Sequence, residues 1–205
     1  VYLPNSRLER GAMKAVSAAA KVLDPKREVR EARAAFDDAP TAQNQMRLAA
    51  ALLDVGEADE AARQYEACLH GPFASNPDIR LGAGRAFVDC LRYAEALGHL
   101  EPLRSERPEF RPEAVSLLIA RSLAGTSRNT EARAEFESAV ARFGTYEAKA
   151  ELAIWAYAVG DTAMADGLSA ELDKIAARWN SLSRELNDPV AKRLAAARSL
   201  AAKSA

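Results

Sequence analysis

The sequence has little that could support a disulfide framework or a metal site. Its 205 residues include two cysteines and two histidines. Cys68 and Cys90 are too few to cross-link a chain of this length, and neither belongs to a closely spaced pair of metal ligands. We expect them to be reduced and buried. Neither His70 nor His99 has a cysteine or carboxylate at ligand spacing on one helical face, so no metal site is expected.

Catalytic motifs are also missing. There is no nucleophile elbow, no metalloprotease histidine pair and no glycine run followed by a phosphate-binding lysine. Gly82-Ala83-Gly84 resembles the opening of a phosphate loop, but it lacks a third glycine and a preceding strand, and we interpret it as a packing site. The sequence therefore predicts a protein that is not an enzyme and has no cofactor. An enzyme with a site in a terminal cap is the alternative left open.

Long apolar runs and a basic excess are absent as well. No run approaches the roughly 20 residues that cross a bilayer, so a soluble chain is expected. The net charge of −1 argues against a nucleic-acid surface. The charge is nevertheless segregated, because residues 1–27 carry +4, residues 174–205 carry +5 and the middle carries −10. This pattern favours either steering of a charged partner or an ordinary solvated surface.

Alanine is what the sequence has in abundance. The chain contains 46 Ala but only 10 Val, 4 Ile and 5 Thr. Alanine loses almost no side-chain freedom in a helix, whereas β-branched residues favour strands. With 49% apolar residues, the chain can also build a sizeable core. The predicted fold class is all-α.

A pattern of apolar residues recurs four times along the chain, with units that begin 35, 36 and 33 residues apart at Ala42, Pro77, Glu113 and Tyr146. Within each unit the apolar residues return every three or four positions, which predicts two amphipathic helices. Repetition at this period is typical of helical repeat arrays, in which each unit buries its apolar face against the next.

The turns between the paired helices are predicted from glycine. Gly56 and Gly160 stand where a helix can end in the left-handed conformation. The third unit has Gly125-Thr126-Ser127 at this place. The second unit has Cys90-Leu91-Arg92, without a glycine, so its turn is the least certain from sequence.

Small residues mark the expected crossing point of each helix pair. They are Ala49, Gly84, Ala120 and Ala153 in the first helices, and Ala61, Ala96, Ala132 and Ala165 in the second. These residues and the repeat length resemble the tetratricopeptide-repeat (TPR) family, over about residues 42–175. The resemblance implies a right-handed α-α superhelix that binds proteins. The sequence departs from the family's pattern because the signature tryptophan is absent, the closing proline survives only as Pro108, and Ser169 replaces a large apolar residue.

Three regions are predicted on this basis. Residues 1–40 form a basic N-terminal helix and a capping helix, residues 41–179 form four TPR-like helix pairs, and residues 180–205 form a C-terminal capping helix. Asp24-Pro25 and Asp188-Pro189 each place an acceptor side chain before a proline, so helices are expected over about 25–37 and from about 189. Pro102 is expected to kink or shorten its helix.

The N-terminal residues also resemble bacterial membrane-anchored TPR proteins of poorly defined function, through the segments 7–16 and 23–28. In that group a short hydrophobic anchor precedes the basic helix. The resemblance implies that residues 1–4 are the end of an anchor and that the +4 segment lies at the cytoplasmic face of the inner membrane. The alternative is a frayed basic terminus of a cytoplasmic protein. Because the chain begins without Met, we expect residues before Val1 in the complete protein.

The remaining candidate chemistry is recognition by the first helices, which line the concave groove in TPR proteins. We expect Arg85 and Arg121 to hold an acidic group of a peptide or protein partner, because a guanidinium binds a carboxylate or phosphate through two donors. The other groove positions are Met46, Ala50, Leu81, Leu117, Ile154 and Tyr157. In the alternative interpretation, Arg85 pairs with Asp89 and Arg121 only faces solvent.

The function predicted from sequence is therefore a non-catalytic scaffold that binds a partner in this groove. A structural or self-assembly module is the competing hypothesis, with an alanine-rich outer face that forms an oligomer and no ligand in the groove. The soluble cytoplasmic arm of a membrane-anchored protein is a variant of either hypothesis.

Overall fold

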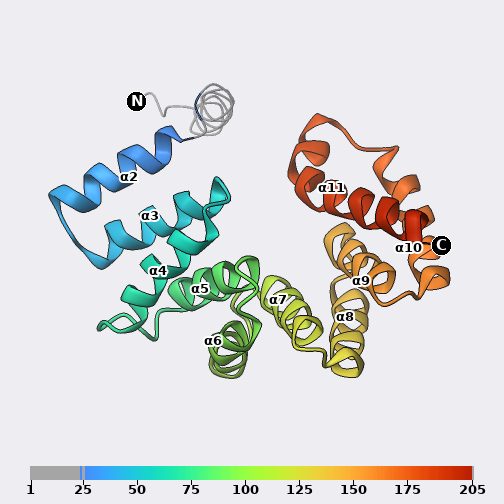
Figure 1. The fold of residues 1–205 in the computed structure, drawn as a ribbon, viewed down its shortest axis with the longest axis horizontal. Coiled ribbons are helices and arrows are strands. Elements are labelled where there is room, and N and C mark those ends of the chain that lie inside the picture. Colours follow the sequence, from blue (N-terminus) through green and yellow to red (C-terminus); the bar gives the residue numbers. More distant parts are fainter. Residues whose placement is uncertain (1–23, 25, 205) are drawn as a thin grey trace, which may run out of the picture. The chain divides into compact units, whose positions relative to one another are not determined.

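The computed structural model describes residues 24 and 26–204, and the described part of the chain is all-α (Figure 1). This confirms the predicted fold class of TPR-like helix pairs. The helices are α2 (Arg27–Asp38), α3 (Ala42–Asp54), α4 (Ala58–Leu69), α5 (Pro77–Asp89), α6 (Tyr93–Glu106), α7 (Pro112–Gly125), α8 (Asn129–Phe143), α9 (Tyr146–Ala158), α10 (Thr162–Ala176) and α11 (Ser181–Ser204). The chain divides into two compact units, residues 1–86 and residues 87–205, and the boundary lies inside α5.

In the N-terminal unit, α3 packs against α2 on one side and α4 on the other. Its core includes Leu48, Leu52 and Tyr65, which are at most 4% exposed. The hydroxyl of Thr41 caps α3 by accepting a hydrogen bond from the backbone N–H of Asn44 at 3.2 Å. The Asn44 side chain in turn donates to the Ala39 carbonyl at 2.9 Å, so this one turn joins α2 to α3.

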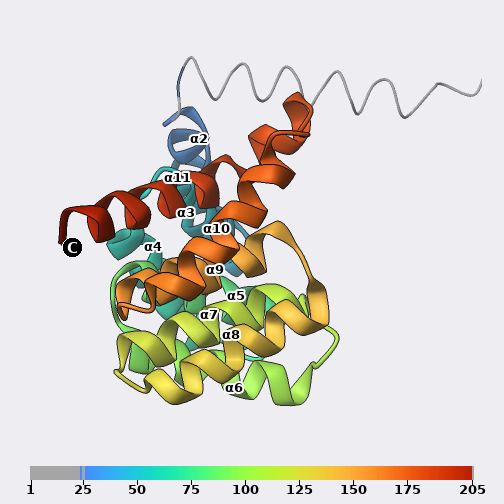
Figure 2. The same cartoon turned by 90° about the vertical axis from the view of Figure 1, so that its right-hand side faces the viewer.

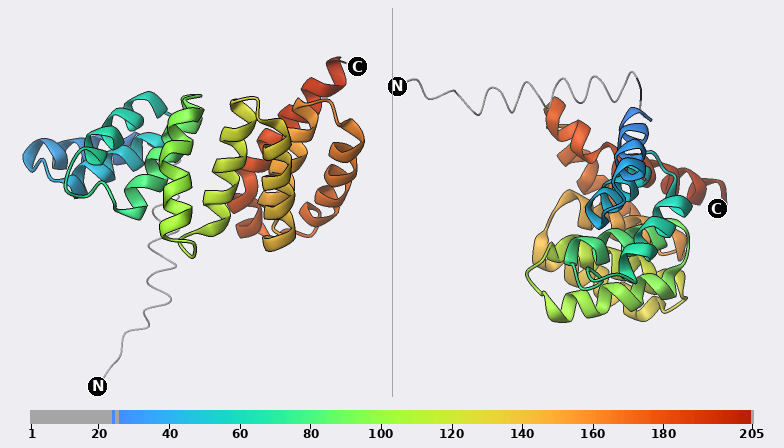
Figure 3. Two further views of the ribbon diagram at one scale, coloured as in Figure 1. Left: turned by 90° about the horizontal axis from the view of Figure 1, so that it is seen from below. Right: turned by 90° about the vertical axis from the view of Figure 1, so that its left-hand side faces the viewer.

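In the C-terminal unit, each helix packs against its neighbours in chain order, from α6 and α7 to α8, α9 and α10 (Figures 2 and 3). First helices also contact each other, since α7 packs on α9. Phe87, Leu100, Phe136 and Leu172 are among the side chains that fill the core, each at most 1% exposed. The last helix, α11, packs along α9.

The small residues predicted at the helix crossings are all buried. Seven of the eight are alanines with no exposed surface, and Gly84 is buried as well. A methyl group or a hydrogen at these places lets the paired helices approach closely, because the distance between helix axes depends on the side chains at the contact. The repeat register inferred from sequence is therefore the register of the structure.

The turns inside the four helix pairs share one geometry. Gly56, Leu91, Ser127 and Gly160 have φ values of +80°, +60°, +61° and +82°, and they follow each other at the repeat spacing. In each turn the next residue donates a backbone hydrogen bond to a carbonyl five residues earlier, as in Arg92 N to Phe87 O at 2.8 Å. The turn predicted from glycine is confirmed at Gly56 and Gly160. In the third pair it falls on Ser127, because Gly125 still belongs to α7.

The last helix does not begin at Pro189 and Pro102 does not shorten its helix, while a kink at Pro102 stays a prediction. The last helix begins at Ser181 instead of Pro189, because the Asn180 side chain accepts from the backbone N–H of Ser183 at 2.8 Å and starts the helix earlier. Pro102 does not shorten α6, which continues to Glu106. Proline removes one donor from a helix, and Pro102 does so on an exposed side of α6.

Gly82 is a packing site, as interpreted from sequence. A Cβ atom at Gly82 would lie 2.4 Å from Cζ of Tyr65, which is 4% exposed. Gly125 meets the ring of Tyr93 in the same way, at 2.2 Å from Cδ2. Both glycines therefore accommodate an aromatic ring of the preceding helix pair.

The left-handed turn residues predict a stabilising substitution. Leu91→Gly should raise the free energy of unfolding by about 1 kcal/mol, because glycine adopts a positive φ without steric cost and the Leu91 side chain is 71% exposed. Gly56→Leu is the matched control and should lower it by a similar amount. Urea unfolding followed by circular dichroism measures both changes. A Leu91→Gly chain no more stable than the parent would contradict this account of the turn.

The glycine contacts predict substitutions of opposite sign. Gly82→Ala should destabilise the chain by about 1–3 kcal/mol, since the added methyl group overlaps the buried ring of Tyr65, which must shift to make room. Gly98→Ala and Gly167→Ala, in helices with no atom within 4 Å of the added Cβ, should stabilise it by about 0.5–1 kcal/mol. The same unfolding measurement applies. Equal effects at the three sites would show that the Tyr65 contact is unimportant.

Candidate binding surface

The predicted binding residues of the N-terminal unit lie on α3 and α5. Ala50 and Arg85 are exposed, Met46 is half-buried, and Leu81 is buried at 8%. Leu81 therefore supports the helix packing, while Ala50 and Arg85 are accessible to a partner.

Arg85 has no ion-pair or hydrogen-bond partner among the residues that the structure describes. It lies near Tyr65, whose pKa is raised to about 12 by burial, and the Arg85 charge acts in the opposite direction on that pKa. The carboxylate that sequence offered as its partner, Asp89, instead accepts a hydrogen bond from Arg121. The alternative interpretation of Arg85 as one half of a surface ion pair is therefore wrong.

The predicted residues of the C-terminal unit lie on α7 and α9. Leu117 is buried at 4%, and Ile154 is half-buried. Arg121 Nη2 lies 3.3 Å from Asp89 Oδ1, and the two side chains are 28% and 35% exposed. A partly exposed pair of this kind contributes about 0–1 kcal/mol, so a ligand carboxylate can compete with Asp89 for the guanidinium.

Tyr157 is turned towards α10. Its hydroxyl donates to Asp166 Oδ1 at 2.6 Å and lies 3.2 Å from the hydroxyl oxygen of Ser169. The Tyr157 side chain is 8% exposed, and burial together with the Asp166 hydrogen bond raises its pKa. This arrangement also explains Ser169, which is fully buried and leaves room for the tyrosine where a large apolar residue is usual.

One charged contact was not foreseen from sequence. Glu151 of α9 is 5% exposed and accepts a hydrogen bond from Nη2 of Arg193, on α11. A buried carboxylate is costly unless a cation is paired with it. Glu151 occupies the repeat position held by Arg47, Gly82 and Leu118 in the earlier units, so its position gave no signal of a buried carboxylate. Nothing in the sequence identified its partner.

The eight predicted residues are divided between the two compact units. Met46, Ala50, Leu81 and Arg85 belong to the first unit, and the other four belong to the second. Their gathering in one groove stays a prediction.

The described residues contain neither a cluster of metal ligands nor a membrane-spanning helix. No group of three or more His, Cys, Asp or Glu side chains there could hold a metal ion. Within residues 24 and 26–204, none of the helices combines the length and the apolar character needed to cross a bilayer. The predicted basic N-terminal helix and the end of an anchor lie in residues 1–23, outside the described part of the chain.

Comparison with solved structures shows the same fold in several proteins. The thermophilic TPR protein TTC0263 of Thermus thermophilus is 17% identical, with a TM-score of 0.65, over 92% of this chain and 98% of that one. The structure "MamA MSR-1 C2" is 19% identical, with a TM-score of 0.60, over 78% and 92% of the two chains. The structure "MamA RS-1 ArsTM double mutant" is 13% identical, with a TM-score of 0.61, over 88% and 99%.

The sequence itself matches no family model and no curated protein. The structural similarity defines the class of fold, which is the TPR-like helix-pair array expected from the repeat register.

The position of Tyr157 predicts a stability effect. Tyr157→Phe should lower the free energy of unfolding by about 1–2 kcal/mol, because it removes a buried hydroxyl that joins α9 to α10. Tyr146→Phe is the control, since Tyr146 contacts Trp179 through its ring, with centroids 4.5 Å apart, and should change stability by less than about 0.5 kcal/mol. Equal losses for the two variants in urea unfolding would contradict the role of the Tyr157 hydroxyl.

Proposed function

We propose that the chain is a non-catalytic scaffold that binds a peptide or protein segment with an acidic group through the first helices of its pairs. In this proposal Arg85 and Arg121 hold the acidic group. The half-buried side chains of Met46 and Ile154 contribute apolar contact, and Leu81, Leu117 and Tyr157 support the helices from within.

The main support for the proposal is that the Arg85 side chain is exposed and unpaired among the described residues. Its side chain is exposed on a first helix, and it forms no ion pair with any described residue. A planar guanidinium with all its donors available can bind a carboxylate or phosphate through two parallel hydrogen bonds. Arginine is also among the residues that most often dominate the energy of a protein interface.

A charge-reversal experiment tests this proposal. The full chain is used to isolate a partner from its source cells, and the purified partner is then titrated against the parent chain and against an Arg85→Glu/Arg121→Glu variant. We expect at least a tenfold loss of affinity, equivalent to about 1.4 kcal/mol, because the variant repels the acidic group.

The control variant is Arg63→Glu/Arg142→Glu, which makes the same change of charge on exposed positions of α4 and α8. It should bind the partner within about twofold of the parent, a difference of about 0.4 kcal/mol. Unchanged affinity in the first variant, or an equal loss in the control, would contradict the assignment to the first helices.

A further inference from the structure

The C-terminal helix α11 packs on the first helix of the last pair. It packs along α9, and Figures 1 and 2 show α9 between α8 and α11. Each earlier first helix is followed by its own second helix, whereas α11 comes after the last pair is complete. Its contact with α9 comes in addition to those that α9 makes with α8 and α10.

The contact between α11 and α9 has the chemistry of a recognition site. Glu151, a carboxylate that is 5% exposed, is anchored by Arg193, and the adjacent Leu194 is buried at 6%. Val190, one turn earlier on the same side of α11, is buried at 7%. A basic residue next to two apolar residues, one turn of helix apart, is the pattern by which an amphipathic helix enters an apolar surface.

The fit of α11 on α9 is incomplete. The apolar stripe of α11 begins with Leu182 and Leu186, which are 61% and 71% exposed, and it is covered only from Val190 onwards. The Nε–H of Arg193 is buried and has no acceptor among the described residues. Pro189 interrupts the backbone hydrogen bonds of α11 between the exposed and the buried halves. Arg198, which lies 3.1 Å from Asp173 of α10, adds only an exposed ion pair.

We propose that the face of α9 carrying Glu151 is a binding surface for a basic amphipathic helix, and that α11 is the resident helix that occupies it. This inference rests on the proposed function in one respect, namely that first helices are the binding helices. The partner helix proposed for α9 is basic, whereas the group proposed to bind Arg85 and Arg121 is acidic. A partner helix carrying Arg or Lys between apolar residues gains access by displacing α11.

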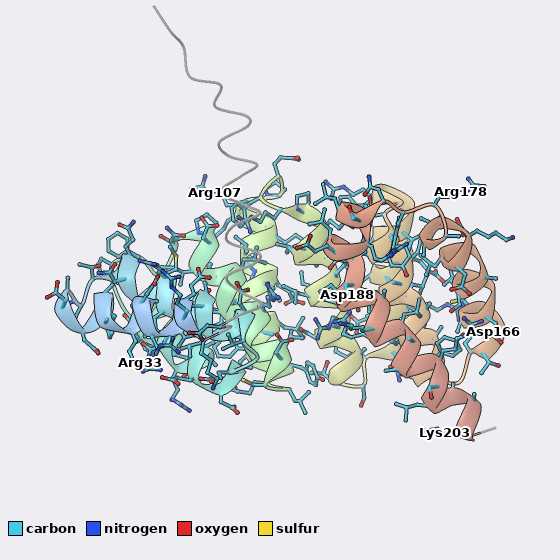
Figure 4. The ribbon with its side chains drawn as sticks, turned by 90° about the horizontal axis from the view of Figure 1, so that it is seen from above. Arg33, Arg107, Asp166, Arg178, Asp188 and Lys203 are labelled. Atoms are coloured by element: carbon cyan, nitrogen blue, oxygen red, sulfur yellow. The ribbon has the colours of Figure 1, made fainter. Side chains whose placement is uncertain are left out.

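The charges along α11 suit this role. Its second half carries Lys192, Arg193, Arg198 and Lys203, and no acidic residue follows Asp188 in the sequence. Figure 4 labels Asp188 and Lys203 on this helix. Lys192 pairs with Asp188 inside α11, so Arg193 is the basic residue that reaches the buried carboxylate of α9. A competing helix needs a cation at the same place, because burying Glu151 without one is costly.

The test uses the full chain and a synthetic peptide of residues 181–204. In an Arg193→Glu chain, two carboxylates face each other and α11 should leave α9. We expect amide hydrogen exchange to become at least tenfold faster in the second half of α11, with α6–α10 still protected. The peptide should bind this chain at least ten times more tightly than it binds the parent, whose site is occupied. A peptide carrying Arg193→Glu should not bind.

The matched control is Lys192→Glu, the same change of charge one residue away, which should leave both exchange and peptide binding as in the parent. A second variant, Val190→Asp/Leu194→Asp, removes the apolar contact without altering either member of the ion pair, and it should also admit the peptide. The inference is overturned if α11 stays protected in Arg193→Glu. It is also overturned if both variants lose protection throughout α6–α10, or if neither binds the peptide more tightly than the parent. None of these results depends on Arg85 or Arg121, so the proposed function is tested separately.

Discussion

The close approach of paired helices over small side chains is the constraint on which the structure depends. Seven alanines without exposed surface, together with the buried Gly84, occupy the crossings of the four pairs. Because each pair contacts mainly its neighbours in such an array, a larger side chain at one crossing displaces the next helix as well. Within each unit, the same spacing sets where a first helix presents its remaining residues. Packing and the candidate binding surface thus have one origin.

Helix pairing could be predicted from sequence because it follows from local periodicity and residue size. The two glycine turns could be predicted for the same reason. The positive φ values at Leu91 and Ser127 could not be predicted, since neither leucine nor serine favours the left-handed conformation. Backbone hydrogen bonds hold them, as in Arg128 N to Leu123 O at 2.9 Å. The start of α11 was missed because the Asn180 cap outweighs the signal from Asp188-Pro189.

The candidate binding surface was predicted less completely than the fold. The exposure of Arg85 follows from its place on an amphipathic helix. Contacts with side chains on other helices cannot be predicted in this way, because they depend on the register between the helices and on the side-chain rotamers. Tyr157 therefore looked like a surface residue although its hydroxyl is bound to Asp166. Glu151 and Arg193 are 42 residues apart, and only the packing of α11 on α9 brings them together.

The repeated left-handed turn has a consequence for how much the sequence can vary within this fold. Because leucine and serine occur at this position as well as glycine, the turn does not require one residue type. The positions that do require a small residue are those at the helix crossings. Most of the remaining surface is then free to drift. Chains that share only 13–19% identity with this one have the same fold. The small residues at the helix crossings are thus a better guide to this fold than the sequence of the turns.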